Sequence, residues 1–177
     1  MQLLPAPGSR ALCGVQRALS LLCAGAPGCE GAALDALGAL GRAPDDAPGF
    51  AERAGGLFAS ALAALRRGDA LDAKARLSRA LKVAHGELGN HELVSQVLGA
   101  LGALVEAQGD AGQARDMLMS AFTLSKSAGD LNAQAGALRV LVRVHNATGA
   151  SKEAGEMERY AAKKKTALAT AISAARA

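Results

Sequence analysis

Aromatic residues are almost absent from this 177-residue chain: it has no tryptophan, one tyrosine and three phenylalanines, although half of its residues are hydrophobic. A hydrophobic core therefore has to be built from alanine, leucine and valine, whose small side chains let helices approach closely. The alternation of polar and apolar residues that is typical of strands is also missing, and helix formers dominate. These absences predict one all-α domain, long enough to bury a sizeable core.

Cysteine is scarce as well, and Cys13, Cys23 and Cys29 all lie in the first sixth of the chain. Their number is odd and no Cys-x-x-Cys pair occurs, so neither a disulfide framework nor a zinc site is indicated. A reducing compartment is the simpler inference. No hydrophobic run reaches the roughly 18 residues that a membrane span needs, so we expect no contact with a membrane.

Three stretches of the chain repeat one spacing, in which a glycine is followed by alanine at +5 and +12 and, in two of the three, by leucine at +9. The sets are Gly68 with Ala73, Leu77 and Ala80, Gly109 with Ala114, Leu118 and Ala121, and Gly149 with Ala154, Glu158 and Ala161. Successive glycines are 41 and 40 residues apart, and a fixed period in this range marks an array of stacked helical hairpins. The alternative is an alanine-rich helical bundle with coincident turns.

Aspartate follows glycine at Asp69, Asp110 and Asp130. Glycine just past a helix end tolerates the left-handed conformation, and aspartate beside it caps the amides of the next helix. We therefore predict about three hairpins with tight corners. Their helices are expected at Pro48–Arg67 with Ala70–His85, His91–Gln108 with Ala111–Ser127, and Leu131–Ala147 with Ser151 to near the C-terminus.

The first 49 residues differ from this pattern. They contain two candidate helices, Ser9–Ala24 and Gly31–Leu40, and then a Pro/Gly-rich linker at Arg42–Gly49. We therefore divide the chain into residues 1–49, with one or two helices and the linker, and residues 50–177, with the repeats. Residues 1–29 contain two arginines and no acid, so a targeting peptide and an ordinary helix both stay open, as does whether the chain is a whole protein.

Motifs for catalysis are missing. The chain has no phosphate-binding loop of the G-x-x-x-x-G-K-[ST] type, no G-x-S-x-G nucleophile elbow and no H-E-x-x-H metal motif. His85 and His91 flank a turn near Glu87 and Glu92, but no fourth ligand has the spacing of a metal site, which favours solvated turn residues. We expect no enzyme activity, no catalytic residue, no metal and no cofactor.

The first helix of each hairpin is expected to line the concave face of the array, where a partner binds. Helical spacing places these candidate partner-binding residues on that face: Phe58, Gln96, Glu106, Arg139, Arg143 and Asn146. Arg139 and Arg143 are i,i+4 neighbours and are suited to clamp an acidic peptide. The alternative is an arginine pair on a face that only meets solvent.

One basic run lies near the C-terminus, with Arg159 followed by Lys163, Lys164 and Lys165. Three consecutive helical residues spread over about 200°, so they cannot all face one phosphate backbone, and no aromatic residue is interleaved for base stacking. The net charge of +4 is modest for a nucleic-acid binder. A solvated face is favoured, the alternative being an auxiliary nucleic-acid contact, and we expect no direct binding of nucleic acid.

The corners, the alanines and the leucines at Leu57, Leu98 and Leu138 resemble the tetratricopeptide (TPR) repeat. The period near 40 departs from the usual ~34, and the usual Trp, Tyr and Pro signatures are missing. The resemblance therefore implies a divergent TPR-like α-solenoid. A narrower resemblance, to the cohesin-loading-factor family of plant or algal type, is carried by HELVSQVL (91–98), Gly109-Asp110, ARDML (114–118), SAFTLSK (120–126) and ERYAAKKK (158–165).

The cohesin-loader resemblance implies a non-enzymatic adaptor of the nucleus and chromatin. Such a protein binds an extended N-terminal segment of the large HEAT-repeat subunit of the cohesin loader. Through that subunit it acts indirectly on cohesin, for sister chromatid cohesion and chromosome segregation in the cell cycle. The alternatives are a TPR-like scaffold with an unrelated client in the cytoplasm, or an organellar helical array that binds nucleic acid.

Overall fold

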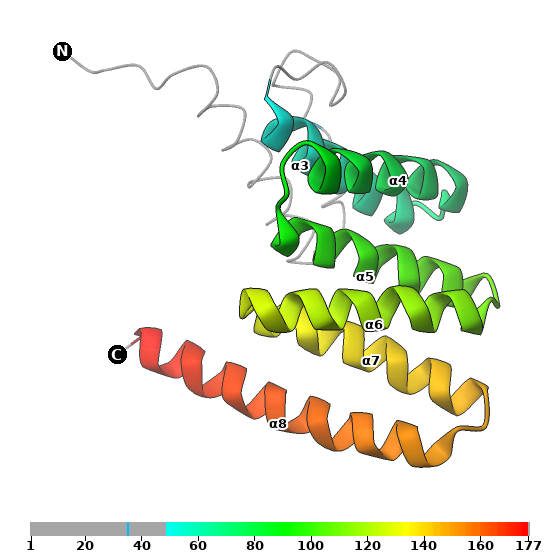
Figure 1. Ribbon diagram of the computed structural model, residues 1–177, viewed down its shortest axis with the longest axis vertical. Helices are drawn as coiled ribbons and strands as arrows, with labels where there is room; N and C mark the ends of the chain where they lie inside the picture. The colour runs from blue at the N-terminus through cyan, green and yellow to red at the C-terminus, as the bar shows by residue number, and fades with distance from the viewer. Residues whose placement is uncertain (1–34, 36–48, 177) are drawn as a thin grey trace. The chain divides into compact units, whose positions relative to one another are not determined.

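The computed structural model describes residue 35 and residues 49–176, and within this part the chain forms six α-helices and no strand. The helices are α3 (Phe50–Arg66), α4 (Ala70–Gly86), α5 (His91–Ala107), α6 (Ala111–Ala128), α7 (Leu131–Ala147) and α8 (Ser151–Arg176) (Figure 1). The predicted all-α array of helical hairpins is confirmed, and the helix ends agree within two residues. The two helices and the linker that were predicted before residue 49, with the three cysteines, lie outside the described residues.

The chain divides into two compact units, residues 1–90 and residues 91–177. In the first unit, α3 and α4 pack as a hairpin. In the second, α5 packs on α6, α6 on α7 and α7 on α8, while α5 also contacts α7. The predicted boundary at residue 49 falls inside the first unit and stays a prediction, because the description before residue 49 is limited to residue 35.

Glycines end four of the helices in the same way. Gly68, Gly109, Gly129 and Gly149 have φ between 73° and 91°, a region in which a Cβ atom is strained. After each glycine, the next amide donates to a carbonyl five residues back, as in the 3.2 Å bond between the Asp110 N–H and the Val105 carbonyl. This is the Schellman arrangement that satisfies the last carbonyls of a helix.

Aspartates start the next helices at three of these corners. The Oδ1 atoms of Asp69, Asp110 and Asp130 accept bonds of 3.0, 2.9 and 2.9 Å from the backbone amides three residues later. Each carboxylate thereby satisfies an amide that would otherwise lack a partner in the first turn. The predicted Gly-Asp corners are confirmed, whereas the fourth corner has Ala150 in place of aspartate.

The repeat positions mark the packing face of the second helices. Ala73, Leu77 and Ala80 of α4 are fully buried, and Ala114, Leu118 and Ala121 of α6 are at most 2% exposed. On α8, Ala154 is buried but Glu158 is exposed and Ala161 is half-buried. The third set therefore keeps the spacing and loses most of the burial.

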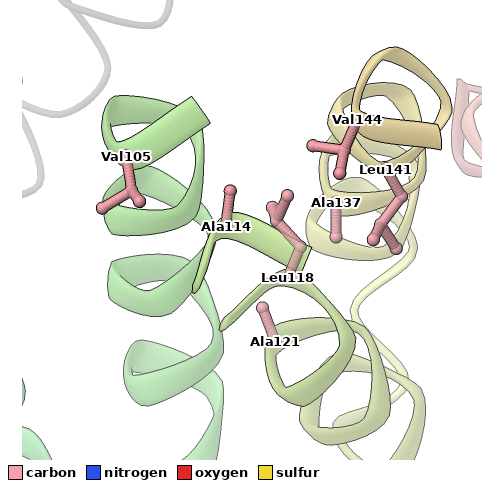
Figure 2. Packing of buried hydrophobic residues seen from close by; sticks show 7 residues of the cluster. All are labelled: Val105, Ala114, Leu118, Ala121, Ala137, Leu141 and Val144. Atoms are coloured by element: carbon pink, nitrogen blue, oxygen red, sulfur yellow. The ribbon is translucent and has the colours of Figure 1, made fainter. Parts of the chain in front are cut away.

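Small and branched side chains fill the core between α5, α6 and α7 (Figure 2). The cluster consists of Val105 from α5, Ala114, Leu118 and Ala121 from α6, and Ala137, Leu141 and Val144 from α7. Gly102 completes the contact, because a Cβ atom built there would lie 2.6 Å from Leu118 Cγ. A side chain at this position of α5 is thus excluded by close packing, which is what the aromatic-poor composition predicted.

Candidate functional site

Five of the six predicted partner-binding residues lie on neighbouring helices of the second unit. Together with the small residues between them, they form a surface that we call the first-helix face. Its members are Gln96, Gly99, Ala103 and Glu106 of α5 and Gly136, Arg139, Arg143 and Asn146 of α7. None of these eight residues is buried, and two hydrogen-bonded links join the helices across the face.

The sixth predicted residue, Phe58, does not lie on an open face. It is 7% exposed, and nearly every position of α3 from Ala54 to Ala64 is buried. The prediction assumed that α3 has one solvent-facing side, as α5 and α7 do. Because α3 is apolar or small around most of its circumference, it has the composition of a helix that is buried all round.

Gln96 and Asp130 form the first link between α5 and α7. The Gln96 Nε2 atom donates to Asp130 Oδ2 at 3.1 Å, while Asp130 Oδ1 accepts the amide of Ala133 at 2.9 Å. One carboxylate therefore caps α7 and also holds α5. The sequence predicts Asp130 as a cap, but this second role depends on the packing of α5 against α7.

Glu106 and Arg143 form the second link. Arg143 Nε lies 3.2 Å from Glu106 Oε1 and Arg143 Nη2 lies 2.9 Å from Oε2, which is the two-pronged geometry of a strong arginine–carboxylate pair. The Arg143 side chain is 59% exposed and that of Glu106 is 22% exposed. The hydrogen bond to Glu106 raises the pKa of Arg143 despite its partial desolvation. Their separation of 37 residues, close to one repeat, was the available sequence signal for this pairing.

Small residues form the part of the first-helix face that lies between the two links. Gln96 and Glu106 are ten positions apart on α5, a rise of about 15 Å. Within this stretch a Cβ atom added at Gly99 would have nothing within 4 Å, and the same holds at Gly136 on α7. The backbones of both helices are therefore open to approach from outside at these two positions.

Arg139 and Asn146 complete the face. Arg139 lies one helical turn before Arg143, is exposed, and makes no ion pair with any described residue. Asn146 is exposed in the last turn of α7. The two arginines thus differ, since Arg143 is paired with Glu106 while Arg139 is exposed and has no such pair with a described residue.

Only two of the four residues in the basic run near the C-terminus have side chains that the structure describes. Arg159 and Lys163 are exposed on α8, and the side chains of Lys164 and Lys165 lie outside the description. Glu156 and Glu158 are exposed on the same helix, so its outer surface carries both charge signs. Mixed charge of this kind is typical of a solvated helix face.

In residues 49–176 and at residue 35, no three His, Cys, Asp or Glu side chains come together as a possible metal site. None of the described helices combines the length and the apolar character needed to cross a bilayer.

The sequence of residues 53–127 matches the tetratricopeptide repeat family, which agrees with the paired helices, the glycine corners and the buried alanines. The fold and this match define the chain as a divergent TPR-like helical-repeat protein. Among curated proteins it is similar to "Sister chromatid cohesion protein SCC4" of Arabidopsis thaliana, with 32% identity over 167 residues that cover 94% of this chain. The aligned part spans 23% of the Arabidopsis protein.

Proposed function

We propose that the chain is an adaptor segment of a cohesin-loader subunit and has no enzymatic activity of its own. The similarity to SCC4 over 94% of the chain carries this proposal, and the TPR match over residues 53–127 supports it. TPR-like arrays present surfaces to other proteins rather than catalytic groups. Sister chromatid cohesion, the process in the name of the Arabidopsis relative, is the process in which we place the chain.

The partner we propose is the large HEAT-repeat subunit of the cohesin loader, bound through an extended segment on the first-helix face. Three features of the face support it: an open floor at Gly99 and Gly136, an exposed cation at Arg139, and polar links that hold α5 and α7 in register. An extended segment can lie close to such a floor, where it gains backbone contacts without displacing large side chains. The site of action that follows is the nucleus, on chromatin.

Affinity capture tests this proposal. The tagged chain should recover the large loader subunit from nuclear extract, and Arg139→Glu combined with Arg143→Glu should reduce the recovery at least several-fold. Arg115→Glu combined with Lys152→Glu is the matched control: it makes the same change in net charge at exposed positions of α6 and α8, near helix N-termini where glutamate is tolerated. Circular dichroism confirms that both variants are folded.

Two results would contradict the proposal. In one, the chain recovers neither the loader nor cohesin although both are detected in the extract. In the other, the control variant loses the partner as completely as the face variant does, which would indicate a non-specific charge effect. A fluorescent fusion that is confined to an organelle would contradict the nuclear site of action and favour the organellar alternative.

A further inference from the structure

The Glu106–Arg143 pair has a geometry that bears on what the first-helix face binds. The carboxylate of Glu106 accepts hydrogen bonds from Arg143 Nε and Nη2 through both of its oxygens. The exposure is unequal: Arg143 is 59% exposed and Glu106 is 22% exposed. The carboxylate therefore lies on the protein side of the pair, and the guanidinium keeps its outer side available to solvent and to a ligand.

Arg139, on the same helix, differs from Arg143 in its pairing. It stands one turn, or about 6 Å, before Arg143, and it is exposed without an acidic partner among the described residues. The other carboxylate at this face, Asp130, is already committed to the α7 amide and to Gln96. The face thus presents two guanidinium groups in a row and a single internal carboxylate, Glu106, that occupies one of them.

We propose that Glu106 is an internal occupant of the anion position at Arg143, and that the first-helix face takes an acidic partner segment by exchanging a carboxylate of that segment for Glu106. This inference rests on the proposed function, since it concerns the same face. Arg139 receives one acidic side chain directly. The Nε–Nη2 edge of Arg143, which Glu106 occupies, receives the next one only when Glu106 gives way, so neutral segments gain nothing from the exchange.

The exchange makes the face distinguish acidic segments from neutral ones. Breaking an exposed ion pair is inexpensive and forming a similar one returns a similar gain, so Glu106 lowers the affinity for acidic segments without abolishing it. A ligand that carries no acid has to leave Glu106 in place and meets only Arg139. Removing the negative charge of Glu106 therefore affects the two arginines differently: Arg139 is unchanged, while Arg143 becomes fully available.

The test uses fluorescein-labelled peptides that tile the N-terminal segment of the large loader subunit, measured by fluorescence anisotropy with the whole chain. For the peptide that binds, an amide version replaces each Asp and Glu by Asn and Gln. We expect Glu106→Gln to tighten binding of the acidic peptide roughly two- to fivefold, the range that one exposed ion pair supports, and to leave the amide version unchanged. Arg143→Ala should remove this gain.

Glu156→Gln is the matched control, because it removes one exposed negative charge from α8, a helix that contributes no residue to the first-helix face. An equal gain with this variant would show a general charge effect and overturn the proposal. If the acidic peptide binds and Glu106→Gln leaves its affinity unchanged or weaker, the exchange is wrong while the proposed function stands. If no peptide binds to the wild type or to Glu106→Gln, the partner assignment fails and the exchange fails with it.

Discussion

Two glycines of α5, three residues apart, allow the packing of this chain to be tested with a single added methyl group. At Gly99 an added Cβ atom has nothing within 4 Å, whereas at Gly102 it would lie 2.6 Å from Leu118 Cγ and 3.0 Å from Leu118 Cδ2. Leu118 is fully buried, and Cγ is the branch point of its side chain, so it cannot simply swing away. Both substitutions to alanine act in the interior of the same helix and differ only in the space that they meet.

The magnitudes follow from these contacts. Gly→Ala in a helix interior favours the helix by about 0.8–1 kcal/mol, so Gly99→Ala should raise the free energy of unfolding by about that amount. Gly102→Ala gains the same term but overpacks a filled core, which costs about 1–3 kcal/mol. The two variants should therefore differ by about 1–3 kcal/mol, or about 2–12 °C in Tm for a chain of this size.

Urea unfolding followed by circular dichroism at the helical band measures the difference, and Leu118→Ala supplies the check on its cause. Leu118→Ala alone should cost about 2–5 kcal/mol because it leaves a cavity, yet in its presence Gly102→Ala should no longer be unfavourable. The reasoning is refuted if Gly102→Ala is as stable as Gly99→Ala, or if the effects at Gly102 and Leu118 add within about 0.5 kcal/mol.

Three further outcomes are expected. Asp110→Ala should lower the free energy of unfolding by about 1 kcal/mol, since the α6 cap is lost; an unchanged urea midpoint would contradict this. Tyr160→Leu should cost about 0.5–1.5 kcal/mol beyond the change in buried area, because its ring meets Phe122 edge-on at 5.7 Å, and the cost should vanish in a Phe122→Leu background. A double-mutant cycle between Glu106 and Arg143 should give a coupling of about 0.2–1 kcal/mol that falls with added salt. Because the pair raises the pKa of Arg143, the stabilisation from this group is present at neutral pH and is lost only as the pH rises through that raised value; loss of the arginine contribution near neutral pH would contradict the assignment.

The helix ends were the part of the fold that the sequence predicted best. The α7 bounds are as expected, Leu131–Ala147, because Asp130 and Gly149 act on their immediate neighbours and their chemistry is visible in a short stretch of sequence. The positions at +5 and +12 from Gly68 and Gly109 were also predictable as packing positions, since small residues recur there with the repeat. Local rules therefore accounted for most of the architecture in the described residues.

The candidate site depended on relations that a short stretch of sequence does not contain. Helical spacing placed Glu106 and Arg143 on one face, but their ion pair depends on how α5 and α7 pack in three dimensions. The link from Gln96 to Asp130 was missed for the same reason. Phe58 shows a different failure, because helical spacing predicted an open side for α3, whereas most of that helix from Ala54 to Ala64 is buried.

The recurring corners have a consequence for how the chain acquires its structure. The backbone hydrogen bonds and the aspartate cap at the Gly109 corner join residues at most five positions apart, so the turn and both helix ends can form before any distant segment arrives. The helices that meet at such a corner are also neighbours in sequence, which keeps contact order low and folding fast. During synthesis, each hairpin of about 40 residues can close soon after it leaves the ribosome, and in the second unit α7 and α8 then add to the surface that α5 and α6 have already formed.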